Sequence, residues 1–333
     1  MKVITCISFH GTGSGAVDDF LKEFDNCVSA RSNIESRFLQ DPDGVSDLEY
    51  NLVDNPNRLN SGYAIKRFKQ FAKDYNHTYK IIFGEKWLEY SNRYADSLVT
   101  AKYPGYWHGD LVLLKPLTRY IYLGRRVFNK CLPKKFRKPR YYNYFPNMDY
   151  YHSYLTREEF LEKTQAYVEN LCGLINPENR EFVILDQLVA TSNIARYIPY
   201  VKDLKVIVVD RDPRDLYINQ MRNGDHVLPR DPKVFAKVYR DQRRMIGTIS
   251  EDLPVLQLKF EDMIYDYDNT TKKVIDFVGE DESHHINPRK VFIPEVSKKN
   301  TRMWLTYPEY KDAAEYLAEE LKEFTYDYSG KLL

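Results

Sequence analysis

Several features are scarce in this 333-residue chain. Its four cysteines are scattered without CxxC spacing, which argues against a zinc site and a disulfide framework and suggests reduced thiols. No apolar run approaches the roughly 18 residues that a membrane span needs. Lys+Arg 49 against Asp+Glu 48 leaves a net charge of +1, which argues against a general nucleic-acid binder. With no signal peptide expected in MKVITCISF, we predict a cytoplasmic protein, associated with membranes at most peripherally.

Strand-like and helix-like segments alternate along the chain. Short apolar runs rich in β-branched residues stand at 3–9, 79–83, 182–186, 205–210 and 255–260. The segments between them have the spacing of amphipathic helices. This pattern is typical of a parallel sheet covered by helices, so we predict one α/β domain over 1–333.

The predicted helices cover 16–24, 232–247, 269–278 and 308–323, the third ending at Gly279 as at a C-terminal cap. The stretch 87–181 interrupts the strand–helix rhythm. We therefore predict that it forms a mostly helical insertion within the domain.

A glycine-rich loop separates the first predicted strand from the first helix. In VITCISFHGTGSGAVDDFLKEF, glycines occupy positions 11, 13 and 15. Such a loop directs backbone N–H groups and the positive helix end at one anion, and Thr12 and Ser14 add hydroxyl donors. The alternative is an ordinary tight turn. An ATP-type phosphate loop is disfavoured because no Lys-Ser/Thr pair follows, and the GxGxG spacing does not fit a dinucleotide fingerprint.

A second element, LKVIVVDRDPRDLYINQMR, is a buried strand that delivers Arg211 at its carboxyl end. Open α/β sheets bind ligands at this edge, and a guanidinium provides a fixed fork of donors. The alternative is a salt-bridged corner in which Arg211 and Arg214 pair with Asp212 and Asp215.

Together these elements resemble the sulfotransferase superfamily, whose RxPRD element binds the 3′-phosphate of the nucleotide and whose first loop binds the 5′-phosphosulfate. VLQLKFEDMIYDYDNTTKKVIDFVG is similar to the family's strand ending in a Tyr-Glu-Asp-Leu type motif and the helix after it. VSKKNTRMWLTYP looks like the C-terminal Lys/Arg loop. The four matches follow the family order over residues 3–308, outside the insertion, and are closer to bacterial or polysaccharide-type members.

This resemblance implies a P-loop-like sulfotransferase fold. It also implies 3′-phosphoadenosine 5′-phosphosulfate as donor, adenosine 3′,5′-bisphosphate as product, and no metal. The implied nucleotide-binding residues are Gly11, Thr12, Gly13, Ser14, Gly15, Ala16, Arg211, Asn219, Lys298, Lys299 and Arg302. Arg211 and Asn219 would hold the 3′-phosphate, with Trp304 packing nearby, while Glu261 and Asp262 would anchor a strand end.

One position departs from the family pattern. The loop Lys or Arg that neutralises the leaving oxygen aligns with Gly11, directly after His10. Either His10 supplies the charge, or a basic residue arrives from elsewhere, or the chain binds nucleotide without fast turnover. For the base that accepts the acceptor proton we select Glu35, by resemblance to polysaccharide-type members. The competing residues are Asp41, Asp43 and His108.

The segment 115–140 has ten basic residues, no acidic residue, and interleaved aromatics. It is a solvated basic face, an acceptor groove for an acidic saccharide, or a contact for anionic lipid headgroups. Single-stranded nucleic acid fits less well with the family resemblance.

The leading hypothesis is a sulfotransferase acting on a hydroxyl or amine of a glycan-like acceptor. A sulfotransferase for a small hydrophobic alcohol, such as a sterol or phenol, is the first alternative. A non-catalytic nucleotide-binding protein is the second. A kinase or glycosyltransferase lacks its expected motifs.

Overall fold

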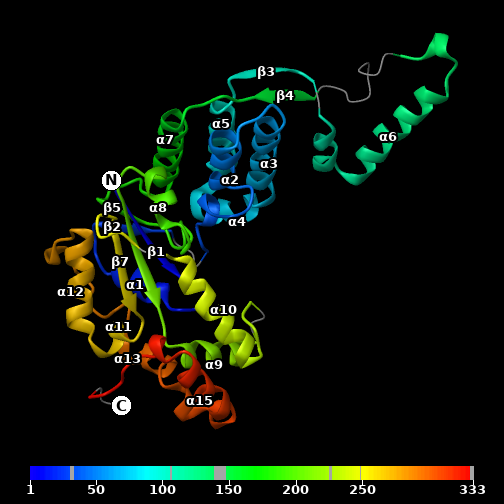
Figure 1. The fold of residues 1–333 in the computed structure, drawn as a ribbon. Helices are drawn as coiled ribbons and strands as arrows, with labels where there is room; N and C mark the ends of the chain where they lie inside the picture. The colour runs from blue at the N-terminus through cyan, green and yellow to red at the C-terminus, as the bar shows by residue number, and fades with distance from the viewer. Residues whose placement is uncertain (31–33, 106, 139–147, 225–226, 248, 331–333) are drawn as a thin grey trace. The chain divides into compact units, whose positions relative to one another are not determined.

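The computed structural model describes residues 1–333 except 31–33, 106, 139–147, 225–226, 248 and 331–333 (Figure 1). The chain forms two compact units. The first comprises Met1–Leu39 and Leu171–Leu333, and the second Gln40–Asn170. The second unit therefore begins well before residue 87, where the insertion was predicted to start, and ends before residue 181.

A five-stranded parallel sheet forms the centre of the first unit. Its order is β2-β5-β1-β6-β7, with bounds Cys27–Ser29, Phe182–Ile184, Lys2–Ser8, Leu204–Asp210 and Val255–Lys259. The predicted α/β class, with a parallel central sheet and flanking helices, is confirmed. β1 pairs with β6 up to Ser8 and Val209, so the loops that follow these two strands start at the same edge.

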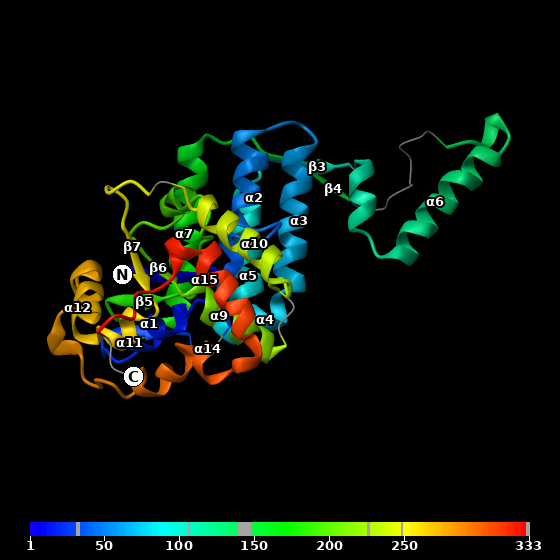
Figure 2. The same ribbon diagram turned by 60° about the horizontal axis from the view of Figure 1, so that its bottom comes forward.

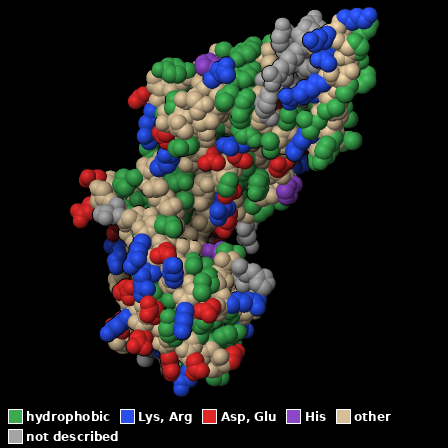
Figure 3. Space-filling model, turned by 45° about the vertical axis from the view of Figure 1, so that its right-hand side comes forward, with side chains coloured by type: hydrophobic (Ala, Val, Ile, Leu, Met, Phe, Trp, Pro, Cys, Tyr) green, Lys and Arg blue, Asp and Glu red, His purple; other side chains and the backbone are tan. Residues whose placement is uncertain are grey.

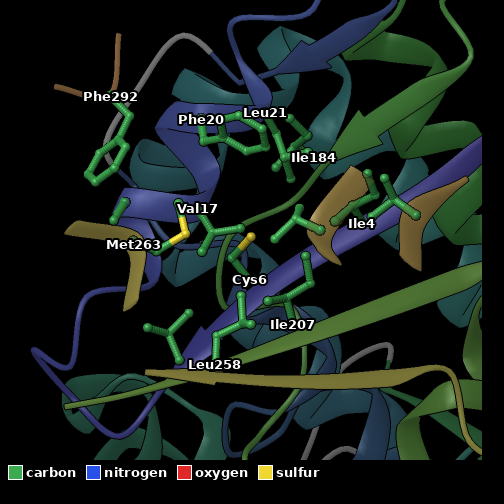
Figure 4. Close-up of a cluster of buried hydrophobic side chains, with 14 of the residues drawn as sticks. Ile4, Cys6, Val17, Phe20, Leu21, Ile184, Ile207, Leu258, Met263 and Phe292 are labelled. Atoms are coloured by element: carbon green, nitrogen blue, oxygen red, sulfur yellow. The ribbon is translucent and has the colours of Figure 1, made fainter. Parts of the chain in front are cut away.

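Helices α1 (Ser14–Leu21) and α12 (Tyr267–Val278) contribute to the main hydrophobic core of this unit. Figure 4 shows Val17 of α1 beside Cys6 of β1, and Phe20 near Ile184 of β5. Alternate strand residues face these helices because side chains change sides at each step along a strand. Burying this surface at roughly 25 cal/mol per Å² holds α1, and with it the preceding loop, on the sheet.

A second core lies among helices at the other end of the chain: α9 (Pro213–Asn223), α10 (Pro232–Met245), α14 (Met303–Thr306) and α15 (Lys311–Glu320) (Figure 2). Asp212 and Asp231 cap α9 and α10 by accepting backbone N–H bonds, and proline follows each cap. The remaining short helices of the unit are α8 (Ile194–Tyr197), α11 (Asp262–Tyr265) and α13 (Pro294–Ser297).

Four of the five predicted strands are confirmed, and the strand at 79–83 is wrong. That segment belongs to helix α4 (Asn76–Phe83). Tyr79, Phe83 and Trp87 recur at four-residue spacing, and their rings lie 4.3–6.2 Å apart between centroids. The apolar run at 79–83 is too short to show this helical period in the sequence. The predicted cap at Gly279 is confirmed, with a left-handed backbone at φ 73°.

The second unit is mostly helical. Its helices are α2 (Val45–Glu49), α3 (Asn60–Asp74), α4, α5 (Trp87–Ser97), α6 (Pro116–Cys131) and the first part of α7 (Arg157–Ile175). An antiparallel ribbon joins β3 (Ala101–Pro104) to β4 (Asp149–His152). Tyr94 stacks on Tyr167 with ring centroids 4.4 Å apart in its core. None of the described helices has a stretch long and apolar enough to cross a membrane.

Candidate functional site

The loop after β1 is held open by backbone that turns left-handed at His10, Gly11 and Gly13. Thr12 fixes the loop to the neighbouring strand: its hydroxyl donates to the Val209 carbonyl at 2.6 Å and accepts the Phe9 N–H at 3.0 Å. Because the hydroxyl proton is used in this way, Thr12 offers a bound anion its backbone N–H rather than the expected hydroxyl donor.

Two of the loop glycines have left-handed backbone and little space for a side chain, although the atom nearest to Gly11 is the movable end of Gln220. A Cβ at Gly13 would lie 2.5 Å from Cδ2 of Phe260, and a Cβ at Gly11 would lie 2.6 Å from Nε2 of Gln220. Gly15 differs, because it is exposed and a Cβ there would meet nothing within 4 Å. Glycine at 15 is therefore not demanded by the fold and leaves open space in front of the loop.

Helix α1 begins at Ser14 without a side-chain cap and without an acidic residue in its first turn. The first N–H groups of a helix lack intrahelical partners and carry the positive end of the helix dipole. Together with the loop amides they form a site suited to an anion. The local sequence supplies this because glycine, not a capping carboxylate, stands at the helix start.

Arg211 lies at the centre of the site and is only 4% exposed. Its guanidinium donates to the Gly11 carbonyl at 3.3 Å and to the Asn300 carbonyl, and it lies over the Phe260 ring at 5.2 Å. Its Nε is buried without a hydrogen-bond partner. Within the described ranges, no carboxylate forms an ion pair with it. Burial raises the pKa of the nearby Asp215 and the charge of Arg211 opposes this rise, so Asp215 compensates that charge only from beyond ion-pair distance. A buried cation that is compensated so weakly favours an anionic ligand.

The rest of the RDPRD motif is structural. Arg214 pairs with Asp212 through two hydrogen bonds, at 2.9 Å from Nε and 2.6 Å from Nη2. Asp215 accepts the Met303 N–H at 2.7 Å and the Tyr328 hydroxyl at 2.9 Å. The salt-bridged corner considered for this motif is therefore formed by Arg214 and does not include Arg211.

Buried carboxylates support this edge of the sheet. Glu261 accepts the Asp212 N–H at 2.9 Å, which ties the end of β7 to the end of β6, and burial raises its pKa to about 8. Asp262 accepts the Tyr326 hydroxyl at 2.7 Å. Burial and the neighbouring Asp212 raise the pKa of Asp215 to about 6. Glu261 thus anchors the strand end, as expected, whereas Asp262 holds the C-terminal segment at Tyr326.

The C-terminal basic loop reaches Arg211 through its backbone. Lys298 and Lys299 lie on the 3-10 turn that ends at Asn300, whose carbonyl Arg211 contacts. The Arg302 guanidinium turns elsewhere, donating to the Tyr328 carbonyl at 3.2 Å. Trp304, expected near the nucleotide, lies against the Arg214 guanidinium at 3.7 Å.

On α9 the structure brings Gln220 to the loop. Asn219, selected by resemblance, is half-buried, whereas Gln220 is 3% exposed and its amide lies against Gly11. The Gln220 Oε1 is buried without a hydrogen-bond partner in the described part of the chain. The sequence carried no signal for Gln220, because its position depends on how α9 packs on the loop.

Sequence reasoning also missed Asp186 and Gln187, which follow β5 at the same edge. Gln187 donates to the Ser8 and Ser14 hydroxyl oxygens at 2.8 and 3.0 Å. The pKa of Asp186 is raised to about 7, chiefly by burial and then by Asp18 and Glu35, although Lys22 and the Ser14 hydroxyl oppose the shift. Asp186 ends a predicted parallel strand, and that position was the signal that could have identified it.

The predicted catalytic residues are exposed. His10 directly precedes Gly11 in left-handed backbone, and Glu35 pairs with Arg37 at 3.3 Å. Of the competing bases, Asp43 pairs with Arg67 at 3.0 Å within the second unit, which also contains Asp41. The side chain of His108 lies outside the described part of the structure. The catalytic roles remain predictions.

We call the Gly11–Ala16 loop, the start of α1 and Arg211 the anion-binding edge. The positive charge of Arg211 and the open space at Gly15 are both compatible with a bound anion. Across the described ranges, no three His, Cys, Asp or Glu side chains are grouped to hold a metal ion.

No family model and no curated protein matches this chain. Among solved structures, it is similar to the sulfotransferase domain from the Synechococcus PCC 7002 olefin synthase. That similarity covers 96% of this chain and 94% of that one at 14% identity, with a TM-score of 0.38. At this level of similarity, the function has to be argued from the residues of the chain itself.

Proposed function

We propose that this protein is a sulfotransferase that uses 3′-phosphoadenosine 5′-phosphosulfate and transfers its sulfuryl group to a hydroxyl or amine. The observation that carries the proposal is Arg211, a buried guanidinium without a carboxylate ion pair that lies against a glycine loop. A nucleotide with phosphate at both its 3′ and 5′ positions would satisfy both parts of the anion-binding edge, whereas ATP would leave the 3′ part without its partner.

Different residues of the anion-binding edge are proposed to hold the two ends of the nucleotide. The Gly11–Ala16 amides and the start of α1 would hold the 5′-phosphosulfate, and Arg211 the 3′-phosphate, with Asn219 and Gln220 adjacent. The predicted contribution of Lys298, Lys299 and Arg302 is additional positive charge over the nucleotide. When bound, the donor supplies an activated sulfuryl group; the protein supplies position and charge.

Two proton-handling roles remain for the chain. His10, next to the loop amides, is proposed to donate to the leaving phosphate oxygen in place of the family's basic residue. For the general base, Asp186 is a second candidate in addition to Glu35. The pKa of Asp186 is near neutrality and the residue lies one hydrogen bond from Ser14, which suits a general base better than an exposed, ion-paired carboxylate.

The acceptor is proposed to be glycan-like. The second unit contains a groove of about 490 Å³, lined by Lys66, Lys69, Gln70, Lys73, Leu88, Asn92, Asp110, Leu113, Leu114, Met148 and Tyr151. Lys66 pairs with Asp110 at 2.8 Å and Lys69 pairs with Asp96, so the charge of these two lysines is largely compensated within the unit. Lys73 and the Tyr151 ring are the contacts that favour an acidic, hydroxyl-rich molecule over a sterol or phenol. This lining supports an acidic saccharide as acceptor.

Calorimetric titration separates the alternatives. We expect adenosine 3′,5′-bisphosphate to bind much more tightly than ATP or a sugar nucleotide. Equal binding of all three would contradict the assignment of the 3′-phosphate to Arg211. Transfer from sulfur-labelled donor to a panel of acidic saccharides then tests catalysis, and tight bisphosphate binding without any transfer would favour the non-catalytic alternative.

A further inference from the structure

Helix α6 leaves large apolar side chains exposed to solvent. It runs from Pro116 to Cys131, and none of its residues is buried. Leu117 is 73% exposed, Tyr120 69%, and Phe128 67%. Helices that pack on a core bury such residues, so an exposed apolar stripe of this size indicates a surface that is covered by something else.

The apolar and basic residues of α6 occupy opposite faces. Leu117, Tyr120, Ile121, Gly124, Val127, Phe128 and Cys131 follow the i, i+3, i+4, i+7 spacing that places them along one side of the helix. Arg119, Arg126 and Lys130 fall on the other side, and Arg125 lies at its border. The apolar face is therefore continuous along the helix, whereas Tyr122 and Leu123 lie among the basic residues of the other face.

The charge around α6 has one sign. No Asp or Glu occurs between Leu111 and Met148 in the sequence. Beyond the helix, the basic series continues with Lys134, Lys135, Arg137 and Lys138, while Arg140 lies outside the described residues. None of the basic side chains at 115–138 forms an ion pair with a described carboxylate. Figure 3 shows this end of the second unit, at the upper right, as blue and green side chains together.

We propose that α6 binds the surface of an anionic membrane, with its apolar face in the boundary between headgroups and acyl chains and its basic face among the lipid phosphates. A strongly amphipathic helix with low net hydrophobicity lies in the plane of the interface rather than crossing the bilayer. The proposal concerns where the protein sits and does not depend on sulfuryl transfer.

The charge selects this partner over others. A second copy would cover the apolar stripe but would bring two basic, acid-free segments together. A nucleic acid or an acidic saccharide would neutralise the charge but would leave the aliphatic stripe of Leu117, Ile121 and Val127 exposed. An anionic lipid surface satisfies both faces at once.

Co-sedimentation of the full chain with vesicles tests the proposal. We expect binding to phosphatidylcholine vesicles that contain phosphatidylglycerol and little binding to pure phosphatidylcholine. The double substitution Ile121→Glu and Phe128→Glu should weaken binding by about tenfold to a hundredfold, because two apolar side chains no longer enter the interface. Ile81→Glu, at an equally exposed apolar position on α4, is the matched control and should bind normally.

A charge series completes the test. Replacing Arg119, Arg125, Arg126 and Lys130 with Gln should lower affinity by about fivefold per residue, and the remaining binding should depend less on salt. The control replaces four exposed lysines elsewhere, Lys86, Lys237, Lys272 and Lys311. Because α6 has no buried residue, all variants should keep the wild-type melting temperature.

Three results would overturn the proposal. The first is no binding to anionic vesicles. The second is binding that the Ile121→Glu and Phe128→Glu double variant retains in full, which would make the contact purely electrostatic. The third is a dimer in sedimentation velocity that this variant dissociates, without vesicle binding by wild type, which would assign the stripe to a second copy. None of these measurements uses the sulfuryl donor, so their outcome is independent of the proposed activity.

Discussion

The anion-binding edge and α6 both bring positive charge close to aromatic rings, but they treat that charge in opposite ways. Arg211 is buried and is held by Gly11, Asn300 and Phe260, three contacts from distant parts of the chain. On α6, Arg125 and Lys130 are exposed, while Arg119 is half-buried and donates to the Val112 carbonyl at 3.0 Å. A fixed, desolvated donor accommodates one ligand geometry, whereas exposed side chains adapt to a surface. Burial therefore separates a specific site from a docking face.

Asp186→Asn should have the largest effect and would show that the anion-binding edge performs chemistry. If Asp186 is the base, the wild-type rate should rise as the pH passes through about 7. The variant should lose that dependence and fall by about 10²–10⁴-fold in turnover. The measurement is a pH profile of single-turnover transfer to any active acceptor. Glu35→Gln is the companion variant, and a loss confined to it would return the base role to Glu35.

His10→Ala should lower turnover by about 10²–10³-fold while changing nucleotide affinity far less, because the proposed donor acts mainly in the transition state. His10 has left-handed backbone, so His10→Asn provides the conformational control: Asn tolerates that backbone but carries no positive charge. His10→Lys should restore part of the rate. If His10→Ala transfers at the wild-type rate, His10 is an ordinary loop residue, and Lys298 or Lys299 would have to supply the charge.

Arg211→Ala should weaken binding of adenosine 3′,5′-bisphosphate by about tenfold to a hundredfold, the value of a charge-assisted pair to phosphate. Calorimetry measures it, with circular dichroism to confirm the fold. Arg222→Ala, at an exposed arginine in the last turn of α9, is the control. If Arg211→Ala binds the bisphosphate as tightly as wild type, Arg211 is not part of a specific site, and the difference from α6 disappears.

Gly15→Asp tests the loop more cleanly than Gly13→Val, whose side chain would collide with Phe260 in a left-handed backbone. An acid in the first turn should leave the free protein as stable or more stable, by about 0.3–1 kcal/mol. It should also repel the phosphosulfate and lower bisphosphate affinity by roughly tenfold. Gly15→Ala is the neutral control. Normal bisphosphate stabilisation of Gly15→Asp in a thermal melt would reduce the loop to a turn.

The last prediction concerns the dependence of stability on pH. The pKa of Glu261 is raised to about 8 by burial, so its folded form holds the proton more tightly than the unfolded chain does. Its stabilising contribution is therefore full below the ordinary Glu range and is lost as the pH rises through about 8. Glu261→Gln, which cannot ionise, should flatten this decline by up to about 1.4 kcal/mol per pH unit. The free energy of unfolding is measured by urea titration at several pH values. If it changes with pH equally in Glu261→Gln and in wild type, Glu261 titrates normally.

The sequence predicted the sheet because its strands are apolar, β-branched and bounded by turns, and it predicted Arg211 because a strand end in an α/β sheet is a ligand edge. It failed at 79–83, where four apolar residues and Lys80 form a run too short to distinguish a strand from a helix, and only Trp87 reveals the helical spacing. Gln220 was not identified because its importance arises from tertiary packing against Gly11, which no local pattern encodes. Asp186 ends a predicted strand, so its place at the sheet edge could be predicted, but its contact with Ser14 and its burial could not.

The contact between Arg211 and the Asn300 carbonyl has a consequence for the order of events at the site. A phosphate bound by the guanidinium would compete with the Asn300 carbonyl for the same donor, so we expect nucleotide binding to change the backbone position of residues 298–300. The contacts from the Arg302 and Met303 N–H groups to Asp215, and between Tyr265 and Thr301, involve no ligand. We therefore expect the loop to stay attached at 301–303 while Lys298 and Lys299 shift towards the nucleotide. Trypsin cleavage at Lys298 or Lys299 should accordingly report occupancy.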